Sequence, residues 1–235
     1  YLVGTSATDV GLQTVGGLTS LKSLELSGHR FTDLGFQNLR SLTELYRFKL
    51  TRTGLTDKGL PYIRGCHKLA ELEIPDADIT DKGLAYLADM KELEFIVLSG
   101  TRVTDEGLKQ FMALEELRKL DLDDTQVTGK GFAVLKDLRR IWHVKMNRCP
   151  IDDGGLAALS QLQGLERLEL DGATLSDAGL ARLKAVPKLK VLSLRGTKGL
   201  TEKVVDSLKE FTWLTELYVR ESSLPESAIS ELKRK

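Results

Sequence analysis

The chain has 235 residues, of which 41% are hydrophobic and 29% are charged. Lys and Arg together number 34, as do Asp and Glu, so no net field attracts nucleic acid or an anionic membrane. No stretch approaches the ~18 consecutive apolar residues that suggest a membrane span. Composition therefore indicates an ordinary folded protein, with neither nucleic acid nor membrane as its partner.

Apolar residues recur along the chain with a period of 24 residues. The series contains Leu24, Phe48, Leu72, Ile96, Leu120, Val144, Leu168 and Leu192, and it continues at Leu217 after one inserted residue. A fixed period in this range marks a repeat array, in which each unit buries its apolar side only by stacking on its neighbours.

The elements of one unit can be predicted from residues 93–108, which read LEFIVLSGTRVTDEGL. The alternation around Ile96 and Leu98 predicts a strand, and a helical return segment follows it. Thr104 or Asp105 is expected to cap that helix, and the Asp carboxylate also favours the positive end of the helix dipole. Gly107 is expected to allow close approach of the neighbouring unit.

The unit L-x-x-L-x-L-x-x-T-x-V-T-D-x-G-L resembles the leucine-rich repeat over the whole chain. Its opener T-D-x-G-L is similar to units of F-box-type and related bacterial repeat proteins. The opener begins at Thr8, Thr32, Thr56, Thr80, Thr104 and, with serine, Ser176. The resemblance implies an α/β leucine-rich repeat solenoid, a horseshoe with a parallel β-sheet on the concave face and helices on the convex face.

In chain order, we expect one domain over residues 1–235, with a truncated first repeat at 1–17 and full repeats from about 18 onward. Leu2 aligns with Leu26, so the first strand is expected to be cut in its middle and the chain to be a fragment of a longer protein. An extra residue falls near 195–200, where a surface loop is expected to absorb it. Residues 228–235 are predicted to close a last helix, with cations that suit its C-terminus.

Three columns of side chains are predicted to face outward from the strands. The first is Ser23, Arg47, Glu71, Phe95, Lys119, His143, Arg167, Val191 and Glu216. The second is Glu25, Lys49, Glu73, Val97, Asp121, Lys145, Glu169, Ser193 and Tyr218. The third is Ser27, Thr51, Pro75, Ser99, Asp123, Asn147, Asp171, Arg195 and Arg220.

Charges alternate along most of the second column, and this pattern has two interpretations. Adjacent strands can pair opposite charges internally, which predicts a ladder between Glu25, Lys49 and Glu73 and another between Asp121, Lys145 and Glu169. Alternatively, the charges form a mosaic that selects a complementary partner.

Three groups of residues interrupt this polar surface and are candidate sites of contact with a partner. Phe95 and Val97 lie on one strand beside Pro75, and a contiguous apolar patch is a usual sign of an interface. Near the other end, Tyr218, Arg195 and Arg220 combine aromatic and guanidinium groups that are enriched in binding hot spots. Trp142 and His143 form the third, although Trp142 lies outside the columns.

No catalytic motif is found, and no cofactor is expected. The histidines His29, His67 and His143 lie in separate repeats. Asp123, Asn147 and Asp171 could offer oxygen ligands to calcium, but Lys145 and Arg148 can neutralise them without a metal.

The cysteines indicate the redox environment. Cys66 and Cys149 are expected about 14 Å apart from strand spacing alone, beyond disulfide reach of roughly 7 Å, and so to be free thiols. Free thiols weakly favour a cytoplasmic location. At the position of Cys149, four other repeats carry Thr53, Thr101, Thr125 or Thr197, whose hydroxyl is expected to satisfy a backbone group in the turn.

These observations predict a non-catalytic scaffold that binds a protein or peptide through its concave sheet. A monomer is favoured over an oligomer. By analogy with the architecture of the family it resembles, the chain would be the recognition arm of a larger protein. The alternatives to a protein-binding scaffold are a small-molecule or ion sensor domain and a structural spacer. The predicted partner-binding residues are Arg47, Pro75, Phe95, Val97, Asp121, Asp123, His143, Lys145, Arg195, Tyr218 and Arg220.

Overall fold

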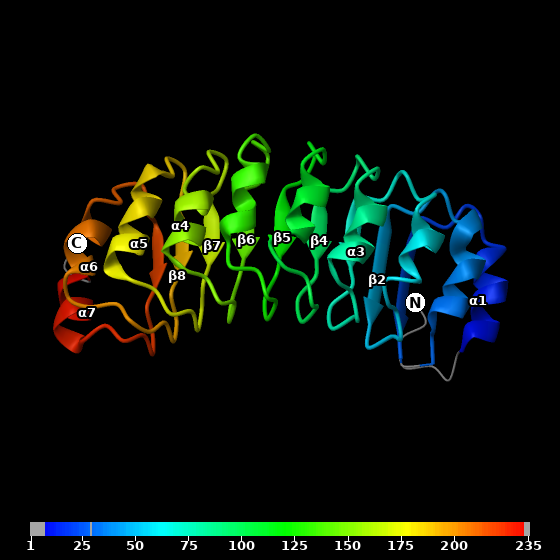
Figure 1. The fold of residues 1–235 in the computed structure, drawn as a ribbon, viewed down its shortest axis with the longest axis horizontal. Helices are drawn as coiled ribbons and strands as arrows, with labels where there is room; N and C mark the ends of the chain where they lie inside the picture. The colour runs from blue at the N-terminus through cyan, green and yellow to red at the C-terminus, as the bar shows by residue number, and fades with distance from the viewer. Residues whose placement is uncertain (1–7, 29, 233–235) are drawn as a thin grey trace.

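A computed structural model describes residues 8–28 and 30–232, so the predicted strand at Leu2 and the side chain of His29 lie outside the described residues. The described chain forms one parallel sheet whose nine strands follow sequence order from β1 to β9 (Figure 1). The strands are β1 (Ser23–Ser27), β2 (Arg47–Thr51), β3 (Glu71–Glu73), β4 (Phe95–Val97), β5 (Lys119–Asp121), β6 (His143–Lys145), β7 (Arg167–Glu169), β8 (Val191–Ser193) and β9 (Glu216–Tyr218).

The return segments are short and consist of α-helix, 3-10 helix or one followed by the other. The α-helices are α1 (Asp9–Gly16), α2 (Asp33–Phe36), α3 (Asp81–Leu84), α4 (Asp153–Leu159), α5 (Asp177–Ala181), α6 (Val204–Lys209) and α7 (Glu226–Leu232). The 3-10 segments are η1 (Gln37–Ser41), η2 (Leu60–Ile63), η3 (Ala85–Leu87), η4 (Gly107–Phe111), η5 (Lys130–Leu135) and η6 (Arg182–Ala185). Figure 1 shows the units side by side in an open arc, with α1 and α7 at opposite ends.

The predicted solenoid and its 24-residue period are confirmed. Each strand pairs with the next at the predicted register, including Leu192 with Leu217 across the insertion. The parallel sheet forms the concave face and the helical segments form the convex face. No helix in the described ranges is both long and apolar enough to span a bilayer.

A continuous core runs through the array because every unit buries the same positions. In the unit that starts at Leu93, that residue, Ile96, Leu98, Val103 and Leu108 are all fully buried. Stacking therefore buries the apolar side of each unit against its neighbours, as a solenoid requires.

The aspartate of the opener does not cap its own helix in the way that the sequence suggested. Asp81 instead accepts hydrogen bonds from the next unit, from the Thr104 backbone N–H at 2.8 Å and the Thr104 hydroxyl at 2.7 Å. Thr80 caps α3 through its hydroxyl, which accepts from the Lys82 N–H. The acidic side chains that reach into the next unit in this way are Asp9, Asp33, Asp57, Asp81, Asp105, Asp153 and Asp177. We call this series the aspartate ladder.

Gly107 has the predicted packing role. A Cβ at this position would lie 2.4 Å from the Asp81 carboxylate and 2.8 Å from Leu84. The absence of a side chain at the glycine therefore leaves room for the carboxylate of the preceding unit. The aspartate ladder and the glycine of the opener thus depend on each other.

The inserted residue is contained in the turn between β8 and α6. Gly199 has a φ of +83° there, and a Cβ on it would meet the Leu175 carbonyl at 2.5 Å. Glycine is suited to this combination of positive φ and close approach. Leu200 returns to the core, so the strand register is unaffected.

Candidate binding surface

The first two predicted columns are confirmed by the strand pairing, which aligns Arg47 with Glu71 and Lys49 with Glu73. The internal interpretation of the charges is supported at this end of the sheet. Arg47 lies 3.3 Å from Glu71 and 2.8 Å from Glu73. Lys49 lies between Glu25 at 3.9 Å and Glu73 at 3.3 Å. These charges are matched before any partner arrives.

A second matched group surrounds Lys145. Its Nζ atom lies 2.9 Å from Asp121 and 2.8 Å from Asp123, and both carboxylates are buried. Burial alone would lower the pKa of Lys145, but the hydrogen bonds to the two carboxylates outweigh it and raise that pKa. The lysine therefore stays charged and neutralises the oxygen cluster that the sequence had suggested for calcium.

The expected pairing of Glu169 with Lys145 is wrong. The Glu169 carboxylate instead lies 3.0 Å from His143 Nε2 and 2.8 Å from Arg167 Nε. The hydrogen bond from His143, with that from Arg167, outweighs burial and lowers the pKa of Glu169 to about 2. His143 is only 7% exposed and lies beside the Trp142 ring, so only Trp142 offers a large contact area in this group.

The third column forms a chain of hydrogen bonds from one repeat to the next. Asp123 accepts from the Asn147 backbone N–H, Asn147 from that of Asp171, and Asp171 from that of Arg195. The oxygens therefore have structural partners. Nowhere in the described residues do three or more His, Cys, Asp or Glu side chains converge as metal ligands would.

The apolar patch lies at β4. Phe95 and Val97 are half-buried, as is the neighbouring Pro75. In register, Phe95 lies between Glu71 and Lys119, and Val97 lies between Glu73 and Asp121. Since Glu71, Glu73 and Asp121 already have internal cations, the patch is bordered largely by charges that are already paired.

The structure also brings Arg195, Tyr218 and Arg220 together. The Arg195 guanidinium lies over the Tyr218 ring, 4.5 Å from its centroid. A hollow of about 400 Å³ adjoins these three residues and is completed by Leu217, Val219, Glu221, Glu226 and Ile229.

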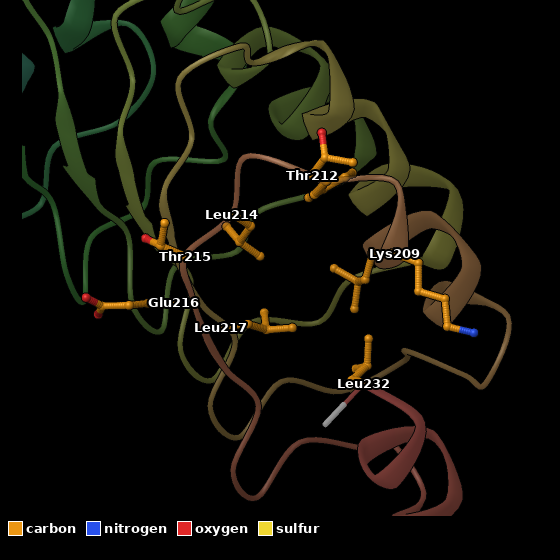
Figure 2. Close-up of a pocket in the computed structure, with 9 residues that line it drawn as sticks. Lys209, Thr212, Leu214, Thr215, Glu216, Leu217 and Leu232 are labelled. Carbon is orange, nitrogen blue, oxygen red and sulfur yellow. The ribbon is translucent and has the colours of Figure 1, made fainter. Parts of the chain in front are cut away.

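A second hollow, of about 430 Å³, was not foreseen. In Figure 2, Leu214, Leu217 and Leu232 lie around a common space between β9 and α7, while the Glu216 carboxylate points away from it. Leu214 and Leu217 hold the positions of Leu189 and Leu192, which are fully buried in the preceding unit. The sequence signal for these residues is their place in the repeat, since they align with core leucines of the preceding unit.

Both cysteines are buried and free, as expected. The Cys66 thiol donates to the Leu42 carbonyl at 3.3 Å, and Cys149 donates to that of Leu122 at 3.0 Å. Burial raises the pKa of Cys66 to about 11 and also raises that of Cys149. Thr101, at the repeat position of Cys149, donates to the Leu98 carbonyl in its own unit, whereas Cys149 donates to a carbonyl of the preceding unit. Threonine thus satisfies a backbone carbonyl in this turn, as predicted, but not the carbonyl that cysteine uses.

Comparison with known proteins supports the same fold. A family model described as a leucine-rich repeat matches residues 17–39 and 65–88. No curated protein matches the sequence significantly.

Among solved structures, internalin C2 from Listeria monocytogenes is 20% identical with a TM-score of 0.65, over 97% of this chain and 89% of that one. A TDR receptor is 14% identical with a TM-score of 0.68, over 97% of this chain and 41% of that one.

A third similar structure is the LRR ectodomain of the plant membrane receptor kinase GASSHO1/SCHENGEN3 from Arabidopsis thaliana, in complex with CASPARIAN STRIP INTEGRITY FACTOR 2. It is 15% identical with a TM-score of 0.60, over 94% of this chain and 27% of that one. The chain thus spans less than half of either receptor structure, and at these identities the similarity shows the fold. By repeat pattern, sheet register and structural similarity, the chain is a leucine-rich repeat solenoid.

Proposed function

We propose that the chain is a non-catalytic scaffold that binds a protein or peptide through its concave sheet. The observation that carries this proposal is the Phe95 and Val97 patch on β4. It is the place in the described sheet where both outward positions of one strand are apolar and half-open. An apolar centre bordered by polar residues is the usual anatomy of a binding interface.

The matched charges around the patch explain how specificity would arise. Arg47, Lys49 and Lys145 are held by carboxylates, so their positions are set before binding. A partner must then complement a fixed pattern, and a mismatched charge would be left unpaired. The receptor ectodomain crystallised with CASPARIAN STRIP INTEGRITY FACTOR 2 supports the proposal by analogy of fold.

The test is a quantitative pull-down from native lysate with three immobilised proteins. These are the unaltered chain, a Phe95→Asp variant, and a Lys109→Glu control on the convex side. Captured proteins are identified, purified and titrated individually against all three. We expect saturable binding to the unaltered chain and the control, with at least about tenfold weaker binding to Phe95→Asp.

Equal binding of the purified partner to all three proteins would refute the proposal that the Phe95 and Val97 patch binds it. Circular dichroism of the Phe95→Asp variant provides the folding control, because this side chain lies on the open side of the sheet and the core beneath it should be unchanged.

A further inference from the structure

Two arginines in neighbouring repeats lie at the same edge of the concave face, just after β8 and β9. Arg195 and Arg220 occupy adjacent places in the third column, and their main chains are held by the sheet. The Arg195 carbonyl accepts from the Gly172 N–H at 2.7 Å, and the Arg220 carbonyl accepts from the Gly196 N–H at 2.9 Å. The backbone positions from which the two side chains extend are therefore held in place by hydrogen bonds.

These arginines are less well matched by carboxylates than most cations of the same face. Arg47, Lys49, Lys145 and Arg167 each lie within 4 Å of at least one carboxylate. Within the described residues, Arg195 has no carboxylate within ion-pair distance. Arg220 has one distant contact, 3.8 Å to Glu221, and both of those side chains are more than four-fifths exposed.

The nearby acidic groups are already engaged. Asp171 accepts from the Arg195 backbone N–H at 2.9 Å and from the Ser193 hydroxyl at 2.5 Å. Glu216 accepts from the Tyr218 hydroxyl at 2.6 Å. The Arg195 guanidinium lies over the Tyr218 ring, and its side chain makes no hydrogen bond to another described residue, so its N–H groups can donate to a ligand.

An apolar recess adjoins these donors. Leu217, Val219 and Ile229 contribute to the hollow of about 400 Å³ that Arg195, Tyr218 and Arg220 border. This volume lies within the range of sites that hold a small ligand or a large side chain. The apolar recess thus lies next to the guanidinium N–H donors of Arg195 and Arg220.

We propose that this hollow receives an apolar side chain of a partner peptide, and that an Asp or Glu side chain next to it in that peptide binds Arg195 and Arg220. The inference rests on the proposed binding function and adds the chemistry of one contact. A guanidinium recognises a planar carboxylate through paired hydrogen bonds, which a neutral amide of the same shape cannot replace. Glu221 and Glu226 also line the hollow, and their repulsion of a backbone with many phosphates exceeds their repulsion of a single carboxylate, which favours a peptide over nucleic acid.

The probe is a mixture of short peptides, acetylated and amidated at their ends, with Leu or Phe followed by Glu at fixed positions and random residues elsewhere. A matched mixture carries Gln in place of Glu. Both are passed over the immobilised chain, over an Arg195→Gln/Arg220→Gln variant, and over an Arg139→Gln control on the helical side. Retained peptides are quantified by mass spectrometry.

We expect the unaltered chain and the control to retain the Glu mixture about tenfold better than the Gln mixture, and the double variant to show no preference. Lack of a Glu preference in the unaltered chain, or its persistence in the double variant, would overturn the inference. A Phe95→Asp variant distinguishes the two proposals, because it should lose the protein partner and keep the Glu preference. Far-UV circular dichroism checks that each variant is folded.

Discussion

Replacement of Asp81 by alanine tests the aspartate ladder. The carboxylate receives the Thr104 N–H at 2.8 Å and the Thr104 hydroxyl at 2.7 Å, both in a partly buried setting. A hydrogen bond to a charged group contributes about 1.5–3 kcal/mol to stability, and partial exposure reduces that value. We therefore expect Asp81→Ala to lower the free energy of unfolding by about 2–4 kcal/mol.

Urea denaturation followed by far-UV circular dichroism measures this loss. Asp9→Ala is the matched comparison, because Asp9 makes the same pair of bonds to Thr32 in an exposed setting. Its effect should be smaller, at about 1 kcal/mol. Since stability in a solenoid is a sum of repeat and interface energies, Asp81→Ala should also broaden the transition by weakening one internal interface.

A double-mutant cycle with Thr104→Val isolates the pair. The valine keeps the backbone N–H and removes the hydroxyl donor, so the two changes should couple by about 1–2 kcal/mol. Strictly additive effects, or equal losses for Asp81→Ala and Asp9→Ala, would refute the view that these carboxylates join neighbouring repeats.

Three further predictions concern packing, pH and thiol reactivity. Gly107→Ala should destabilise the fold by about 1–3 kcal/mol, because the added Cβ would lie 2.4 Å from the Asp81 carboxylate. Gly65→Ala is the control in the same denaturation assay. Its Cβ would have its nearest neighbour 3.7 Å away, so stability should change by less than about 1 kcal/mol. The pKa of Glu169 is lowered from 4.5 to about 2 by its bonds to His143 and Arg167, so its contribution to stability is present above pH 4.5 and is lost as pH falls toward 2. Glu169→Gln should remove that part of the acid dependence, and an unchanged stability profile across this pH window would contradict it. Cys66 and Cys149 are buried with raised pKa values, so a thiol reagent should modify them only after urea unfolding; rapid labelling of the native chain would argue against the buried placement.

The architecture was predictable because it depends on short-range alternation repeated at a constant interval. Leu24 and Leu26 must point to one side of a strand and Glu25 to the other, and the same reasoning applies 24 residues later. The outward columns followed directly, and they include all of the partner-binding residues predicted from the sequence, whereas Leu217, Val219 and Ile229 of the proposed hollow lie outside them.

The roles of individual polar side chains were not predictable in the same way. A Thr-Asp pair before a helix fits a local cap as well as it fits a bond to the next repeat, and the choice depends on how closely the units stack at Gly107. Glu169 has three cationic or imidazole neighbours within reach by register, and side-chain conformation assigns it to His143 and Arg167 rather than Lys145.

Sequence by itself determined the repeat, its register and the residues on each face, since these follow from the covalent geometry of alternating side chains. Only the tertiary structure decided which of the outward residues remain available. Pairing across strands uses the charges of Arg47 and Lys145 and buries His143, but leaves Arg195 and Arg220 without close carboxylates. The physical reason is that availability depends on distances between side chains of different repeats, which a one-dimensional pattern does not contain.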